Sequence, residues 1–141
     1  MASVTHLAKR FAGSLSARPP SADDESWALA QLRPGERLVW RRMSSADRRH
    51  AVGVARRTAA ALGRDVPRPV LAAAVAGRER LARGQGRFGQ YLRHDELGAE
   101  LLADGDSEPL TIAWTAQHHR PESAGTVPRR YADALKAADD D

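Results

Sequence analysis

The sequence predicts an all-α fold, a compact single-domain helical bundle, and three observations support this prediction. Apolar residues recur at helical spacing, as Leu7, Phe11 and Leu15 do at i, i+4 and i+8. Residues that favour helix ends stand before and after several of these apolar segments. Runs of alternating β-branched residues and internal repeats are absent from the sequence. The length of 141 residues suits one domain with a modest core.

The N-terminal part is expected to contain short helices separated by proline-rich segments. A first helix is predicted over residues 7–15, followed by a linker at 16–21 that contains Pro19 and Pro20. Ser21 then precedes acidic residues that suit the positive end of a helix dipole, so a second helix is expected from there, carrying Trp27. Pro34-Gly35 is expected to interrupt the chain before a short apolar element at 38–40.

The clearest predicted helix begins at Ser44, because Ser44 to Asp47 has the form of a capping box. Gly63 is placed as its C-terminal stop. Its inward stripe is predicted to contain Ala51, Val54, Thr58, Ala61 and Leu62.

Further helices are expected after this one. Pro69 begins a helix that continues to Leu81, and the Gly-rich residues 84–86 form a loop. A helix over 95–103 ends near Gly105, and Ser107 with Pro109 begins the next, through residue 117. Residues 126–128 begin the last helix, whose apolar positions are Tyr131, Leu135 and Ala138.

Composition restricts the function classes. The absence of cysteine excludes disulfides and cysteine-based zinc sites and favours a reducing compartment, so a cytoplasmic location is expected. The N-terminus lacks the apolar stretch of a signal peptide, and no apolar run is long enough to cross a bilayer, so we expect no membrane partner.

The formal net charge of +4 raises the hypothesis of nucleic-acid binding. Basic residues are concentrated locally within residues 41–57, but elsewhere arginines alternate with acidic residues, as in Arg78-Glu79-Arg80. No nucleic-acid-binding motif appears in the sequence. We therefore expect a solvated helical surface rather than a nucleic-acid partner. The residues that the rejected hypothesis would use are Arg41, Arg42, Arg48, Arg49, Arg56 and Arg57.

Four of the five histidines and one aspartate are the candidate site residues, and each also has an ordinary structural explanation. His50 lies within a turn of Val54 on the predicted inward stripe, where a histidine is more often a hydrogen-bonded core residue than a metal ligand. His94 directly precedes the predicted helix 95–103, which is compatible with a simple flanking role.

Two further candidates lie nearer the C-terminus. The pair His118 and His119 ends a predicted helix, where the dipole also favours a cationic imidazole. Asp139 falls two turns after Tyr131, and a carboxylate on an apolar face needs a metal, a cation or hydrogen bonds. The alternative is that residues 139–141 form a frayed acidic tail.

The order of these residues resembles the HD superfamily of metal-dependent phosphohydrolases, most closely the branch related to HDIG and HD-GYP domains. The similar features are a helical His at His50 with Val54, the segment His94-Asp-Glu-Leu-Gly-Ala-Glu-Leu-Leu102, the pair at 118–119, and an Ala-Asp at 138–139. The resemblance covers residues 44–141 and leaves 1–43 as an N-terminal helical extension.

The resemblance implies a metal site. His50 and Asp139 match ligands of a first ion, whereas His94, His118 and His119 match residues that serve a second ion or a substrate phosphate. Imidazole and carboxylate ligands suit Mn, Fe, Zn, Ni or Mg ions, and such an ion acidifies a bound water and neutralises phosphoryl oxygens. The implied partner is a phosphate-containing small molecule, such as a phosphoester or a nucleotide.

The chain departs from the family where the His-Asp doublet belongs, at the end of the helix that begins at Pro69. The segment there reads Val70-Leu-Ala-Ala-Ala74 and runs directly into Val75-Ala-Gly-Arg78. The domain is therefore shortened. Two ligands are fewer than the three that catalytic metal sites usually keep, so weak or absent catalysis is expected. The alternatives are a non-catalytic helical module that binds a nucleotide or a protein, and a shortened form of a longer active protein.

Overall fold

Helices form the regular secondary structure in residues 18–76, 102–104, 106–117 and 125–140, the part of the chain that this computed structural model describes. The predicted all-α fold is confirmed. Predictions for residues 7–15, 77–81 and 84–86, and most of that for 95–103, lie outside the described residues. The helices are α2 (Ala22–Ala30), α3 (Pro34–Arg42), α4 (Ser45–Leu62), α5 (Arg68–Ala76), α7 (Pro109–Gln117) and α8 (Arg129–Asp140).

Local hydrogen bonds explain where two of the helices begin. Ser21 Oγ accepts a hydrogen bond from the backbone N–H of Asp24 at 3.1 Å, and Ser44 Oγ accepts one from the N–H of Asp47 at the same distance. Each bond satisfies an N–H group that lacks a partner within the helix. Helix α4 ends at Gly63, whose φ of 80° is a conformation that a side chain would disfavour. These predicted ends are confirmed.

The start of α3 differs from the prediction. Pro34 and Gly35 do not interrupt the chain ahead of the apolar element, because α3 begins at Pro34 itself. A proline in the first turn of a helix loses nothing by lacking an N–H group, since that group would have no partner in the helix. The N–H of Arg33 instead donates to Glu36 Oε2 at 2.7 Å, which closes the first turn.

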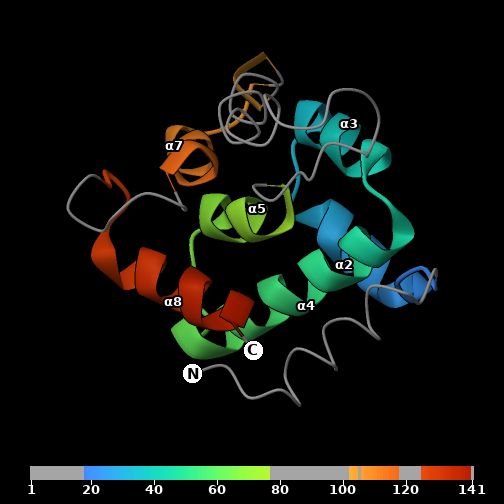
Figure 1. The fold of residues 1–141 in the computed structure, drawn as a ribbon, viewed down its shortest axis with the longest axis horizontal. Coiled ribbons are helices and arrows are strands. Elements are labelled where there is room, and N and C mark those ends of the chain that lie inside the picture. The colour runs from blue at the N-terminus through green and yellow to red at the C-terminus, as the bar shows by residue number, and fades with distance from the viewer. Residues whose placement is uncertain (1–17, 77–101, 105, 118–124, 141) are drawn as a thin grey trace, which may run out of the picture.

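Helix α5 is the centre of the fold (Figure 1). After Arg68 in its first turn, its side chains are apolar on all sides, and every residue from Val70 to Ala76 is buried. It packs against α3, α4, α7 and α8. A helix without a polar face must be enclosed in this way, so α5 determines where its neighbours lie.

Helix α4 buries a broader face than its predicted stripe, because it packs against α2, α5 and α8 together. Of the predicted stripe, Ala51, Val54 and Thr58 are buried, but Ala61 is exposed and Leu62 only half-buried. The last turn therefore lies at the edge of the core, with Leu62 still packed against it. The predicted stripe also omitted two buried residues, Val52 and Ala55, which lie on the flank of α4.

A single core contains residues from both sides of position 44, where the family resemblance begins. Ala28 of α2 and Trp40 of α3 belong to the same buried cluster as Val54, Val75 and Leu135. The predicted apolar face of α8 is confirmed, because Leu135 and Ala138 are buried and Tyr131 packs at the edge of the core.

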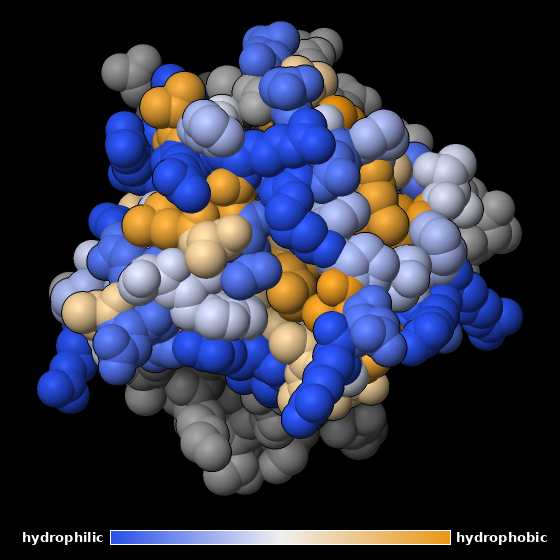
Figure 2. All heavy atoms as spheres, turned by 180° about the vertical axis from the view of Figure 1, so that it is seen from behind, coloured by the Kyte–Doolittle hydropathy of each residue, from blue (hydrophilic) through white to orange (hydrophobic). Residues whose placement is uncertain are grey.

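The described surface is mostly polar. In Figure 2, apolar side chains reach the surface in several patches separated by hydrophilic ones. Among the described residues, Leu38 is the large hydrophobic residue that is exposed, at 54%. None of the described helices combines the length and the apolar character that a membrane span requires.

A charge network joins α3, α5 and Glu108, the residue directly before α7. Glu36 is completely buried, and Arg68 Nη1 lies 3.2 Å from its Oε2 and donates to the carbonyl of Gln31 at 2.8 Å. Arg68 also pairs with Glu108 through Nη2, and Arg33 lies 3.7 Å from Glu108. A buried carboxylate is tolerated only when such partners replace water. Arg68 supplies the cation beside Glu36, and the N–H of Arg33 supplies a further hydrogen bond to the same oxygen.

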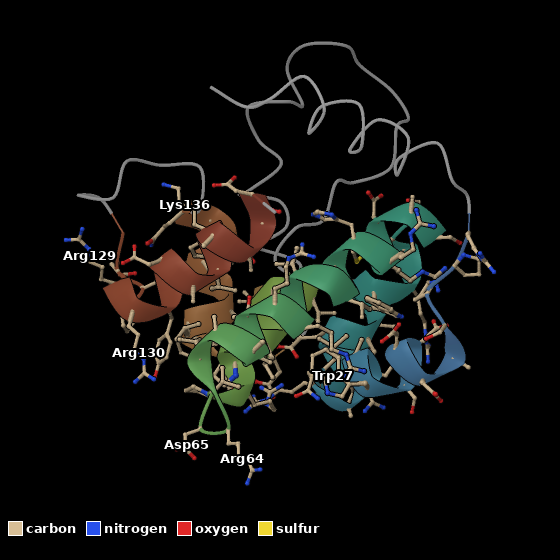
Figure 3. The ribbon with its side chains drawn as sticks, turned by 90° about the horizontal axis from the view of Figure 1, so that it is seen from below. Trp27, Arg64, Asp65, Arg129, Arg130 and Lys136 are labelled. Carbon is tan, nitrogen blue, oxygen red and sulfur yellow. The ribbon has the colours of Figure 1, made fainter. Side chains whose placement is uncertain are left out.

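Replacing Arg68 with methionine should lower the free energy of unfolding by about 3 kcal/mol, because it leaves Glu36 buried without its cation. Urea denaturation monitored by circular dichroism measures this loss. The matched control is Arg64→Met, which changes an exposed arginine in the loop after α4 that points away from the helices (Figure 3). The control should stay within about 0.5 kcal/mol of the parent protein. Equal losses in both variants would contradict the assigned role of Arg68.

Candidate functional site

Helix α4 places His50 facing α8. The residue lies in the second turn after the Ser44 cap, on the side of α4 that packs against α8. Its side chain is 41% exposed. The predicted inward position was therefore wrong in detail, because His50 stands at the solvent edge of the helix–helix contact rather than inside the core. An ion or a ligand from solvent can reach an imidazole in this position.

Helix α8 brings Asp139 to the same edge. Asp139 lies in the last turn of α8, directly after the buried Ala138, and its side chain is 21% exposed. The burial of Leu135 and Ala138 holds this turn against the core. Asp139 is thus an ordered helical residue, and the frayed-tail alternative does not apply to it.

His50 and Asp139 meet directly. Nε2 of His50 lies 3.1 Å from Oδ1 of Asp139, although 89 positions separate the two residues in the chain. The contact is a hydrogen bond when Nε2 carries a proton and an ion pair when the ring is fully protonated. One imidazole nitrogen and one carboxylate oxygen at this spacing also form half of a typical transition-metal ligand set.

The other candidate ligands cannot be placed. His94, His118 and His119 lie outside the described residues. In the described ranges there is no group of three or more His, Asp or Glu side chains that could hold a metal ion. Within those ranges the structure therefore brings together two of the five predicted site residues.

Arg57 binds α8 beside the pair, and the sequence did not identify it as a residue of the site. Its Nε donates to the backbone carbonyl of Ala138 at 2.8 Å, next to Asp139. The spacing contained a signal, since Arg57 lies seven residues after His50 and so on the same side of α4. The acceptor is a backbone carbonyl. Every residue has one, so the sequence does not show which carbonyl Arg57 binds.

The arginines of α4 bind within the molecule. Arg48 pairs with Glu25 at 3.1 Å, and Arg56 lies 3.9 Å from the ring centre of Trp27 and 3.2 Å from Asp24. Arg49 donates to the carbonyl of Arg18 at 2.8 Å.

These contacts join α4 to α2 and to the segment before α2, and they occupy arginines that the nucleic-acid hypothesis would need. Arg64, Arg130 and Lys136 also point in different directions (Figure 3). The described basic residues labelled there do not gather into one patch.

A double-mutant cycle should detect the contact between His50 and Asp139. The His50→Ala and Asp139→Ala changes, alone and together, should give a coupling between about 0.2 and 1 kcal/mol in the free energy of unfolding, because the pair is only partly buried. Urea titrations at neutral pH in the presence of EDTA measure this coupling without any contribution from metal. Strict additivity of the two changes would show that the pair does not interact in solution.

Comparison with known proteins does not extend this description. No family model, no curated protein and no solved structure matches the chain. The functional argument therefore depends on the residues of this chain and on the geometry described above.

Proposed function

We propose that the chain is an impaired metal-dependent phosphohydrolase of the HD type, in which His50 and Asp139 hold a divalent ion. The observation that carries the proposal is the 3.1 Å contact between these side chains, which come from different helices. The resemblance selected the two residues as ligands of the same ion, and ligands of one ion must lie side by side.

The spacing of the pair fits shared coordination. Ligand atoms bind Zn or Mg at about 2.1 Å, so two neighbouring ligands are about 3.0 Å apart in the octahedral geometry of Mg and about 3.4 Å apart in the tetrahedral geometry of Zn. The two donor atoms lie 3.1 Å apart, so an ion to one side of the line that joins them could bind both atoms once the His50 ring is deprotonated and turned toward it. The partial exposure of His50 leaves room for water or substrate on the outer side.

The chemistry is limited by the number of ligands. A bound divalent ion would acidify a water molecule and neutralise phosphoryl oxygens. The residues of this chain do the rest: Asp139 provides negative charge, and His50 provides a neutral nitrogen donor when deprotonated. With two described ligands where catalytic sites usually keep three, the proposal expects weak metal binding and slow hydrolysis of phosphoesters or nucleotides.

Metal binding by calorimetry is the direct test of the proposal. The parent protein should bind Mn²⁺ or Zn²⁺, or Fe²⁺ without oxygen, and either His50→Ala or Asp139→Ala should weaken affinity by at least about tenfold, a loss that even outer-shell changes cause. The matched control is Asp140→Ala, because Asp140 is the next residue and is exposed. A parent protein that binds none of these ions rules the proposal out.

Activity distinguishes an impaired enzyme from a non-catalytic module. With saturating Mn²⁺, slow turnover of bis-p-nitrophenyl phosphate or of nucleotides should be abolished in the His50→Ala, Asp139→Ala double variant. If nothing is hydrolysed but a nucleotide raises the melting temperature, the alternative of a helical nucleotide-binding module is favoured.

A further inference from the structure

We infer that Arg57 is a positioning residue for Asp139, and that Gly53 provides the space in which the Arg57 guanidinium lies. This inference rests on the proposed function for its significance, because Asp139 is one of the two proposed ligands. Its evidence, however, is the contact between α4 and α8 and does not involve a metal.

The first step is the bond from Arg57 to α8. The carbonyl of Ala138 is in the last turn of α8, where carbonyl groups have no partner within the helix. Arg57 Nε donates to this carbonyl at 2.8 Å. A cation at the C-terminal end of a helix is also favoured by the helix dipole, so Arg57 satisfies both the hydrogen bond and the charge.

The second step is the consequence for Asp139. Successive residues of a helix are about 100° apart around its axis, so holding Ala138 also sets the direction of Asp139. Ala138 is buried, and its carbonyl is bound to α4. Together these constraints prevent α8 from turning about its axis, and they keep Asp139 facing His50.

The third step is the space that Gly53 leaves. A Cβ atom at position 53 would lie only 3.2 Å from Nη1 of Arg57, closer than ordinary van der Waals contact. The arginine therefore folds back over the preceding turn of α4 at a position without a side chain. Glycine is unfavourable in the middle of a helix relative to alanine, so the close approach of the guanidinium explains why it is suitable here.

The test measures the coupling between His50 and Asp139 in different Arg57 backgrounds. The cycle of His50→Ala and Asp139→Ala is repeated with Arg57→Met, which keeps much of the apolar stem and removes the donor, and with Arg57→Lys, which keeps a cationic donor. We expect the coupling to be lost with methionine and at least partly restored with lysine. Gly53→Ala should reduce the coupling without removing any polar group.

The matched control is Arg56→Met, because Arg56 is the adjacent arginine of α4 but binds α2 through Asp24 and Trp27. It should lower stability and leave the coupling unchanged. If Arg57 only stabilised the fold, Arg57→Met would likewise lower stability and leave the coupling unchanged. An undiminished coupling in Arg57→Met, or no coupling in the parent protein, therefore overturns the inference. If Arg57→Met does not fold, Gly53→Ala decides, and an unchanged coupling in that variant overturns the inference.

The experiment separates this inference from the proposed function. All cycles are run in EDTA, so a protein that binds no metal refutes the metal site and leaves the positioning test intact. Conversely, a coupling between His50 and Asp139 that is the same with and without Arg57 refutes the positioning role. This holds even when calorimetry shows metal binding that depends on His50 and Asp139.

Discussion

The enclosure of α5 is the constraint on which the rest of the structure depends. No residue from Val70 to Ala76 has a polar side chain, so each side of this helix has to be covered by another element. Its many alanines allow neighbouring helices to approach closely. As a result α4 and α8 lie against α5 and against each other, and the contact between His50 and Asp139 forms at the solvent edge of that arrangement.

Polar interactions specify the arrangement that the apolar core makes favourable. Apolar burial has no preferred direction, so it cannot by itself set the rotation of a helix about its axis. In this chain, arginines supply the direction. Arg68 joins α5 to Glu36 of α3, Arg56 joins α4 to α2, and Arg57 joins α4 to the end of α8. These three arginines therefore have a role in the packing of the described helices.

The features that the sequence predicted correctly are those determined by neighbouring residues. Ser44 and Gly63 mark the two ends of α4 through a local hydrogen bond and a backbone conformation. Both residues were identifiable without tertiary information. Ala61 was assigned to the core wrongly, because periodicity does not show where a helix leaves its neighbours. The meeting of His50 and Asp139 was suggested by family resemblance, since no spacing rule relates residues so far apart. The bond from Arg57 to a backbone carbonyl has no sequence pattern.

The shortage of ligands follows from α5 itself. The resemblance places the His-Asp doublet at the end of this helix, which packs against both α4 and α8, the helices that carry the proposed pair. Here that end consists of Ala72 to Ala76, with side chains no larger than that of Val75 and at most 1% exposed. Such a closely packed segment offers methyl groups where a metal needs nitrogen or oxygen. It also has no room for an imidazole, because enlarging a buried alanine in a closed core causes strain. The packing of α5 therefore limits the proposed metal site to donors from α4 and α8 within the described helices.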